Sequence, residues 1–147
     1  MLRSIRALNA MPVVCDKTGR KIGRVKNVFV DRKLSRITGL SVSAGFGRSA
    51  FYPGGSISLL GTKAVMISGK KGGREEGEAF SIRRAVNVSG EMIGAVTNAY
   101  ACPETLEIER LEISRDVFSD IARGRRTHRR FTVNEETGDA VIYEERE

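Results

Sequence analysis

The sequence predicts an all-β protein made of two small barrels that pack against each other. Three features of the 147 residues lead to this prediction. One part of the chain resembles a later part, apolar and polar residues alternate over short stretches, and a charged, glycine-rich linker separates the two similar parts. Short strands between Gly-rich turns, with little helical periodicity, are typical of small barrels and sandwiches.

The internal repeat appears when the chain is shifted by 71 residues, which aligns residues 19–43 with residues 90–114 without a gap. Eight of these 25 positions are identical, where chance would give roughly one or two. The identical pairs are Gly19/Gly90, Ile22/Ile93, Gly23/Gly94, Val25/Val96, Asn27/Asn98, Ile37/Ile108, Leu40/Leu111 and Ser43/Ser114. The ends also correspond, because Ala64-Val65 resembles Ala140-Val141. We therefore expect one fold written twice, in residues 1–69 and 79–147.

The segment between the copies, residues 69–78, contains four glycines, six charged residues and no apolar residue. Such a composition is typical of a solvated linker.

Each copy is predicted to begin with a hairpin. In copy one, residues 12–15 lead through the turn Asp16-Lys17-Thr18-Gly19 into a strand over residues 22–30. Gly23 and its equivalent Gly94 lie inside that strand, where a bulge or a bend favours a residue without a side chain.

The next strand of each copy alternates in character. Leu40 and Val42 are predicted to face the core while Ser41 and Ser43 face water, and Leu111 and Ile113 repeat the pattern. Residues 115–123 are the exception, because their apolar residues have helical spacing and predict one or two helical turns.

These motifs resemble the PRC-barrel family, named for the cytoplasmic part of the photosynthetic reaction centre H subunit. The resemblance rests on Gly-x-x-Ile-Gly-x-Val, at residues 19–25 and 90–96, followed by two apolar strands and a Gly shortly before Ala-Val. It implies two tandem barrels without catalytic residues. Its members include the C-terminal domain of a ribosome maturation factor, so the resemblance implies a binding or scaffolding protein. Copy two has Cys102 where copy one has Asp31, so a function of that turn need not be shared.

Composition weighs against most enzyme classes. Cys15 and Cys102 are too few for a disulfide framework or a zinc site, and His128 is the sole histidine. Glu104, Glu107, Glu109 and Glu112 lack a neighbouring histidine, and we expect a break in the pleat near Arg110 to leave Glu107 and Glu109 in water. We therefore expect no enzyme, no metal, no cofactor and no small-molecule substrate. The chain has neither a secretory signal nor a long apolar stretch, which predicts a cytoplasmic protein.

Charge is unevenly distributed. Residues 1–79 carry 15 basic and 5 acidic residues, a net charge of +10, while residues 80–147 carry 10 and 13, a net charge of −3. The candidate phosphate-contacting residues are the cations of the first hairpin and the following turn: Lys17, Arg20, Lys21, Arg24, Lys26, Arg32, Lys33 and Arg36. They either bind RNA, face the acidic second copy, or form a solvated surface.

Two loops are candidate protein-binding sites. One is the glycine-rich loop with Phe46, Phe51 and Tyr52, whose aromatic side chains suit anchors in a partner or a seal for the barrel end. The other is the Arg-rich loop of copy two, with Arg125, Arg126, Arg129 and Arg130.

We predict a non-enzymatic adaptor that binds another protein through these loops. The alternative is an RNA- or ribosome-associated factor that uses the basic hairpin and the Arg-rich loop. Peripheral contact with an anionic membrane has less support, because no amphipathic helix or lipidation motif is present. A homo-oligomer is also compatible with the sequence.

Overall fold

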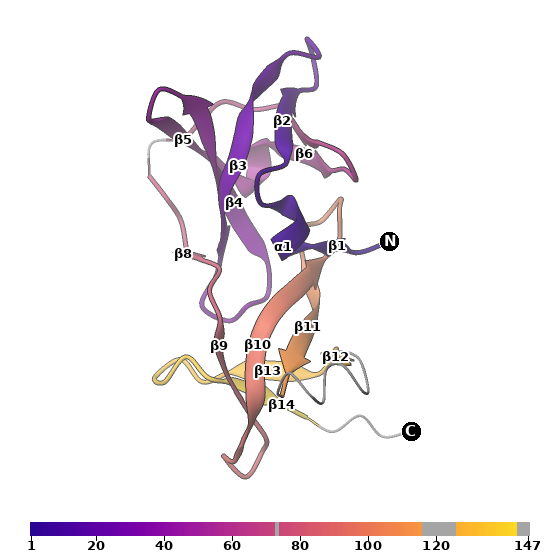
Figure 1. The fold of residues 1–147 in the computed structure, drawn as a ribbon, viewed down its shortest axis with the longest axis vertical. Helices are drawn as coiled ribbons and strands as arrows, with labels where there is room; N and C mark the ends of the chain where they lie inside the picture. The colour runs from indigo at the N-terminus through magenta and orange to yellow at the C-terminus, as the bar shows by residue number, and fades with distance from the viewer. Residues whose placement is uncertain (73, 116–125, 144–147) are drawn as a thin grey trace.

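The structure is a computed structural model that describes residues 1–72, 74–115 and 126–143. Figure 1 shows two groups of strands stacked along the long axis, the earlier in indigo to magenta and the later in rose to yellow. The earlier elements are β1 (Arg3–Ser4), α1 (Ile5–Leu8), β2 (Pro12–Cys15), β3 (Lys21–Val30), β4 (Ile37–Gly45), β5 (Arg48–Pro53), the 3-10 turn η1 (Gly54–Ser56), β6 (Ile57–Leu60) and β7 (Val65–Ile67). The later elements are β8 (Glu78–Ala79), β9 (Arg83–Val86), β10 (Met92–Ala101), β11 (Ile108–Ser114), β12 (Arg126–His128), β13 (Phe131–Val133) and β14 (Ala140–Ile142).

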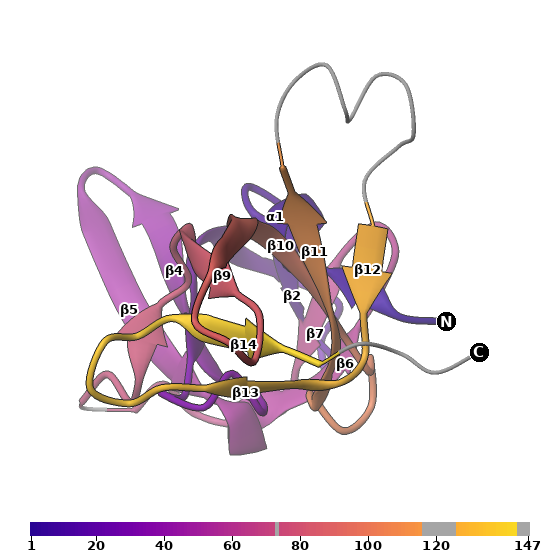
Figure 2. The same ribbon diagram turned by 90° about the horizontal axis from the view of Figure 1, so that it is seen from below.

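The two sheets have the same topology. The first has the order β5-β4-β3-β2-β7-β6 and the second the order β12-β11-β10-β9-β14-β13. In both sheets the first strand of the hairpin also pairs in parallel with a strand near the end of the copy, as β2 does with β7 and β9 does with β14. The prediction of an all-β fold with two packed, barrel-like halves is confirmed. Figure 2 shows the second sheet from below, with β13 at its outer edge.

The repeated glycine of the motif lies at a bulge in both copies. The pairing of β2 with β3 skips one residue beside Gly23, and the pairing of β9 with β10 skips one beside Gly94. A Cβ atom on either glycine would overlap a backbone carbonyl of the following strand, that of Ser43 or Ser114. The predicted bulge is confirmed, and the close approach of the next strand explains why this position is a glycine.

A second predicted irregularity is also present in copy two. Between β10 and β11 the register skips Glu109, so that Tyr100 pairs with Arg110 and Ala101 with Ile108. Glu107 and Glu109 are exposed, while Ile108 is buried. The bulge therefore keeps both carboxylates in water, as the sequence predicts.

The prediction that Ser41 of β4 faces water is wrong, because Ser41 is 5% exposed. The rings of Phe29 and Phe51 stack edge to face with centroids 5.4 Å apart on the strands that flank β4. Ser41 pairs directly with Phe51, and Gly39 leaves room for the Phe51 ring. Two aromatic residues thus cover a face that alternation alone predicts to be solvated.

The two halves exchange strands. The N-terminal strand β1 pairs with β10 of the second sheet, with Arg3 opposite Ala101, and β8 pairs with β3 of the first sheet, with Glu78 opposite Val30. Val30 and Ala101 hold the same position of the repeat, so the exchange is reciprocal. One continuous core contains buried residues of both halves, including Ile5 and Leu8 of α1. Residues on either side of the predicted linker therefore contribute to both sheets.

Most of the described linker residues are exposed, but the linker makes specific contacts. The Gly72 N–H donates to the Phe51 carbonyl over 2.7 Å, and the Thr38 hydroxyl donates to the Glu76 carbonyl over 2.6 Å. These bonds hold the linker along the first sheet, beside β8.

The helical turns predicted for residues 115–123 lie outside the described residues, apart from Arg115. Within the described ranges the helices are α1 and η1, four and three residues long, and neither is long enough to cross a membrane.

Candidate protein-binding groove

Only one of the three aromatic candidates is accessible. Phe46 lies at the tip of the β4–β5 hairpin with a left-handed backbone and a fully exposed side chain, at 104% relative exposure. Phe51 and Tyr52 are 6% and 9% exposed and lie inside the first half. Their burial restricts any aromatic anchor in this loop to Phe46, because a partner cannot reach rings that the protein itself covers.

The predicted phosphate-contacting residues divide into two groups, one over the hairpin and the first six residues of β3 and the other in the turn that follows β3. Their side chains are exposed in both groups. The hairpin tip group consists of Lys17, Arg20, Lys21, Arg24 and Lys26, and the turn group of Arg32, Lys33 and Arg36. Residues 27–31, which include no cation, separate the two groups along the chain.

Among the described residues, one of these cations forms an ion pair, and its partner lies in the linker and not in the acidic second copy. Arg32 lies 3.8 Å from Glu78, and the other ion pair seen among the described residues joins Arg84 to Asp139. Arg24 instead donates to the carbonyl of Ala10 over 2.9 Å.

The Arg-rich loop is described in part. Arg126 lies on β12, and Arg129 and Arg130 form the connection to β13. All three are exposed. Arg125 lies outside the described residues.

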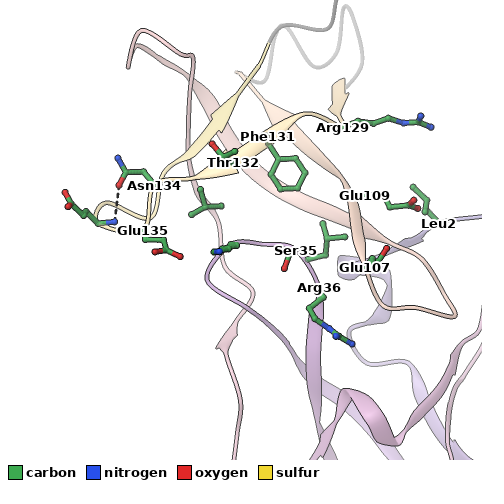
Figure 3. A pocket seen from close by; sticks show the side chains of 14 residues that line it. Leu2, Ser35, Arg36, Glu107, Glu109, Arg129, Phe131, Thr132, Asn134 and Glu135 are labelled. Carbon is green, nitrogen blue, oxygen red and sulfur yellow. Dashed lines mark hydrogen bonds between the residues drawn. The ribbon is translucent and has the colours of Figure 1, made fainter.

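A groove of about 1320 Å³ lies between the two halves and brings together residues from both sets of candidates. Lys33 and Arg36 come from the β3–β4 turn and Arg129 from the second half. The groove is lined by Leu2, Lys33, Ser35, Arg36, Glu107, Ile108, Glu109, Arg129, Phe131, Thr132, Val133, Asn134, Glu135 and Glu136. Figure 3 shows the Phe131 ring pointing into the groove, with Ser35 on the other side.

Phe131 and Val133 of β13, which the sequence analysis did not select, contribute to the apolar lining of the groove beside Leu2 and Ile108. Phe131 and Val133 are half-buried and pack on the core from the groove side. Their equivalents in the first half are Ile57 and Leu60, since these pair with Ile67 and Val65 as Phe131 and Val133 pair with Ile142 and Ala140. Ile57 is 7% exposed and Leu60 is fully buried. The apolar residues of β6 are therefore buried in the first half, whereas those of the equivalent strand β13 line the groove.

In the first half, other segments of the chain form two hydrogen bonds with Leu60 of β6. The Leu60 N–H donates to the Pro103 carbonyl of the β10–β11 turn over 3.1 Å, and the Leu60 carbonyl accepts from Arg3 Nε over 2.9 Å. The residue equivalent to Arg3 is Glu78, which occupies the matching place in β8. A carboxylate cannot donate to a carbonyl at neutral pH, and Glu78 pairs with Arg32 instead. This sequence difference leaves the second-half strand without the corresponding bond.

The chemistry of the groove is that of a binding surface. Its charged residues carry both signs, with Lys33, Arg36 and Arg129 beside Glu107, Glu109, Glu135 and Glu136. Within the described ranges, no three His, Cys, Asp or Glu side chains gather in a way that would hold a metal ion.

A comparison with known protein families matches residues 2–74 to the PRC-barrel domain. The match covers β1 to β7 and residues 69–74 of the linker. No curated protein matches the chain significantly.

Proposed function

Because the chain belongs to the PRC-barrel family through residues 2–74, we propose that it is a non-enzymatic adaptor that binds another protein in the groove between its two halves. The groove carries this proposal, because it joins half-buried apolar side chains of β13 to a charged rim. Protein interfaces have this composition, an apolar centre surrounded by polar residues.

The charges of the groove favour a protein over a nucleic acid. Glu107, Glu109, Glu135 and Glu136 would repel phosphate groups along the same surface that Lys33, Arg36 and Arg129 would attract. A protein segment can match both signs, because it carries both acidic and basic side chains.

One observation supports a second candidate, an RNA- or ribosome-associated factor. The exposed cations of the hairpin tip group do not line the groove, and none of them forms an ion pair with the rest of the described chain. Contacts of such cations with phosphates would be salt-sensitive and independent of base sequence.

Two variants with the same change in net charge separate the candidates. The groove variant combines Lys33→Glu with Arg36→Glu, and the hairpin variant combines Lys17→Glu with Lys21→Glu; all four side chains are exposed. The tagged wild type and both variants are used to capture partners from host lysate, with and without nuclease, and the bound proteins are identified by mass spectrometry.

The adaptor proposal expects one stoichiometric protein that survives nuclease, is lost with the groove variant and is retained by the hairpin variant. A set of partners that disappears with nuclease and with the hairpin variant would overturn it in favour of RNA. Phe46→Ala in the same assay reports whether the exposed ring at the β4–β5 tip contributes to the contact.

A further inference from the structure

We propose that the partner contributes a single extended peptide segment, which lies in the groove and pairs antiparallel with the free edge of β13. This inference rests on the proposed function, since it specifies how a protein partner occupies the groove.

The backbone of β13 has an unused edge. Asn134 N–H donates to Asp139 and Tyr143 N–H donates to Arg130, so the even-numbered residues of this segment bond to β14. In an antiparallel pair the intervening residues direct their N–H and C=O groups to the opposite side. The N–H groups of Phe131 and Val133 therefore point away from β14, and no acceptor for them is present in the described ranges. A strand edge of this kind is a template for another strand.

The chain itself shows what such an edge binds. The position equivalent to Val133 is Leu60, and its N–H is satisfied by a backbone carbonyl from the other half, that of Pro103. The residue equivalent to Pro103 is Arg32, in the β3–β4 turn. In the second half, however, the groove separates that turn from β13. The missing ligand at Val133 is thus a backbone carbonyl, which an added strand supplies.

The walls of the groove favour a single strand over a second copy of this protein. Leu2, Lys33, Ser35 and Arg36 line the groove together with β13, so the space beyond its edge is bounded by the first half (Figure 3). The β13 edge of another copy would bring β14 and a complete first half with it. An extended peptide needs only the spacing between neighbouring strands, about 4.8 Å.

The charges at the two ends of β13 specify the peptide. Residues 129–136 read Arg-Arg-Phe-Thr-Val-Asn-Glu-Glu, with cations before the strand and carboxylates after it. An antiparallel peptide therefore needs basic residues near its N-terminus, apolar residues in the middle and acidic residues near its C-terminus. The sequence of residues 129–136 has this pattern itself. Aligned antiparallel about Thr132, it places Arg129 opposite Glu135 and Phe131 opposite Val133.

The test uses the full-length chain and a fluorescent synthetic peptide with the sequence of residues 129–136. The control peptide exchanges the two terminal Arg-Arg and Glu-Glu pairs. Val133→Pro removes the outward N–H without affecting a bond to β14, and proline is tolerated at such edge positions. Val133→Ala is the matched control, because it shortens the side chain and retains the N–H. Circular dichroism and thermal melting verify that both variants are folded.

We expect the peptide to bind Val133→Ala more weakly than wild type, because the shorter side chain loses apolar contact in the groove. Val133→Pro should weaken binding about tenfold or more relative to Val133→Ala, because it also removes a backbone hydrogen bond and blocks close approach. The control peptide should also bind more weakly.

Equal binding of the peptide by folded Val133→Pro and Val133→Ala would overturn strand addition, as would the absence of binding to all variants. A dimer seen by sedimentation that Val133→Pro disrupts would also overturn the peptide assignment, because a second copy would then occupy the edge. If a captured protein depends on Lys33 and Arg36 but not on the Val133 N–H, the adaptor function stands and only strand addition fails.

Discussion

Arg36 and Glu107 lie directly opposite each other in an antiparallel bridge, although they hold the same position in the two repeats. The bonds beside them are reciprocal. Ile37 N–H donates to the Leu106 carbonyl and Ile108 N–H donates to the Ser35 carbonyl, each over 2.9 Å. The two halves thus face each other across an approximate twofold axis at this bridge. A contact between equivalent residues is typical of a symmetric dimer, here within one chain.

The reciprocal contact predicts that neither half reaches the stability of the whole. Residues 1–74 produced alone lack β8, and residues 75–147 lack β1 and α1, which contribute Ile5 and Leu8 to the shared core. A domain of about 70 residues also buries a smaller fraction of its surface than a domain of twice that length. Urea denaturation of the full chain and of both halves should give lower midpoints for the halves. Equal midpoints would contradict the shared core.

Asn98 should stabilise the protein where its repeat equivalent, Asn27, does not. Asn98 is 5% exposed. Its side chain accepts from Arg6 N–H over 3.0 Å and donates to the Ser4 hydroxyl over 2.7 Å, which caps α1. Asn98→Ala should lower the free energy of unfolding by about 1–3 kcal/mol, because it leaves buried polar groups unpaired.

Asn27→Ala is the matched control for that measurement. The Asn27 side chain is half-exposed and forms no hydrogen bond within the described ranges. Its replacement should change the free energy of unfolding by less than about 0.5 kcal/mol. Hydrogen exchange of α1 should accelerate in the Asn98 variant alone. Equal losses in both variants would mean that Asn98 does not anchor the N-terminal segment.

Gly23→Ala should destabilise the first half through a backbone overlap. The added methyl group would overlap the carbonyl of Ser43 on β4, and such overpacking costs about 1–3 kcal/mol. Gly55→Ala is the control, since nothing lies within 4 Å of a Cβ at that position. Thermal melting should show a lower Tm for Gly23→Ala only. A Tm equal to that of the control would show that β3 and β4 can separate at low cost.

Replacing Phe51 should lower the stability of the protein, whereas replacing Phe46 should leave the stability unchanged. Phe51→Ala removes a buried ring that stacks on Phe29 and should cost about 3–5 kcal/mol. Phe46→Ala alters a fully exposed ring, so the free energy of unfolding should remain within about 0.5 kcal/mol of wild type. Any loss of partner capture by Phe46→Ala would then reflect binding. A large destabilisation by Phe46→Ala would place its ring in the core.

The repeat could be predicted from the sequence because the positions that the two copies share are those where local packing allows few residue types. Gly23 and Gly94 are fixed by the approach of the next strand, and Leu111 and Ile113 by alternation across a half-buried sheet. The alignment of the repeat ends is one residue out. Val65 and Ala140 are equivalent, because they pair with Val13 and Ala85. A short β-strand flanked by turns has too little pattern to fix its register.

The strand exchange and the groove could not be predicted in the same way. The strands β1 and β8 have two residues each, which is too short for any periodicity. The groove depends on the contrast between Arg3, which donates to the Leu60 carbonyl, and Glu78, which cannot donate to the equivalent carbonyl of Val133. That contrast has meaning only after both residues are placed on exchanged strands.

Cys15 should react with alkylating reagents at lower pH than an ordinary thiol. The hydroxyl and backbone N–H of Thr18 and the N–H of Lys17 donate to its sulfur and lower the pKa of the Cys15 thiol. These bonds favour the thiolate, which is the reactive form. The rate of alkylation should therefore reach half its maximum at a lower pH than for an unperturbed cysteine. Thr18→Val removes the hydroxyl donor at similar size, so it should shift the midpoint to higher pH. Measuring iodoacetamide reaction in a Cys102→Ser background isolates Cys15, and an unchanged midpoint would mean that the Thr18 hydroxyl does not stabilise the thiolate.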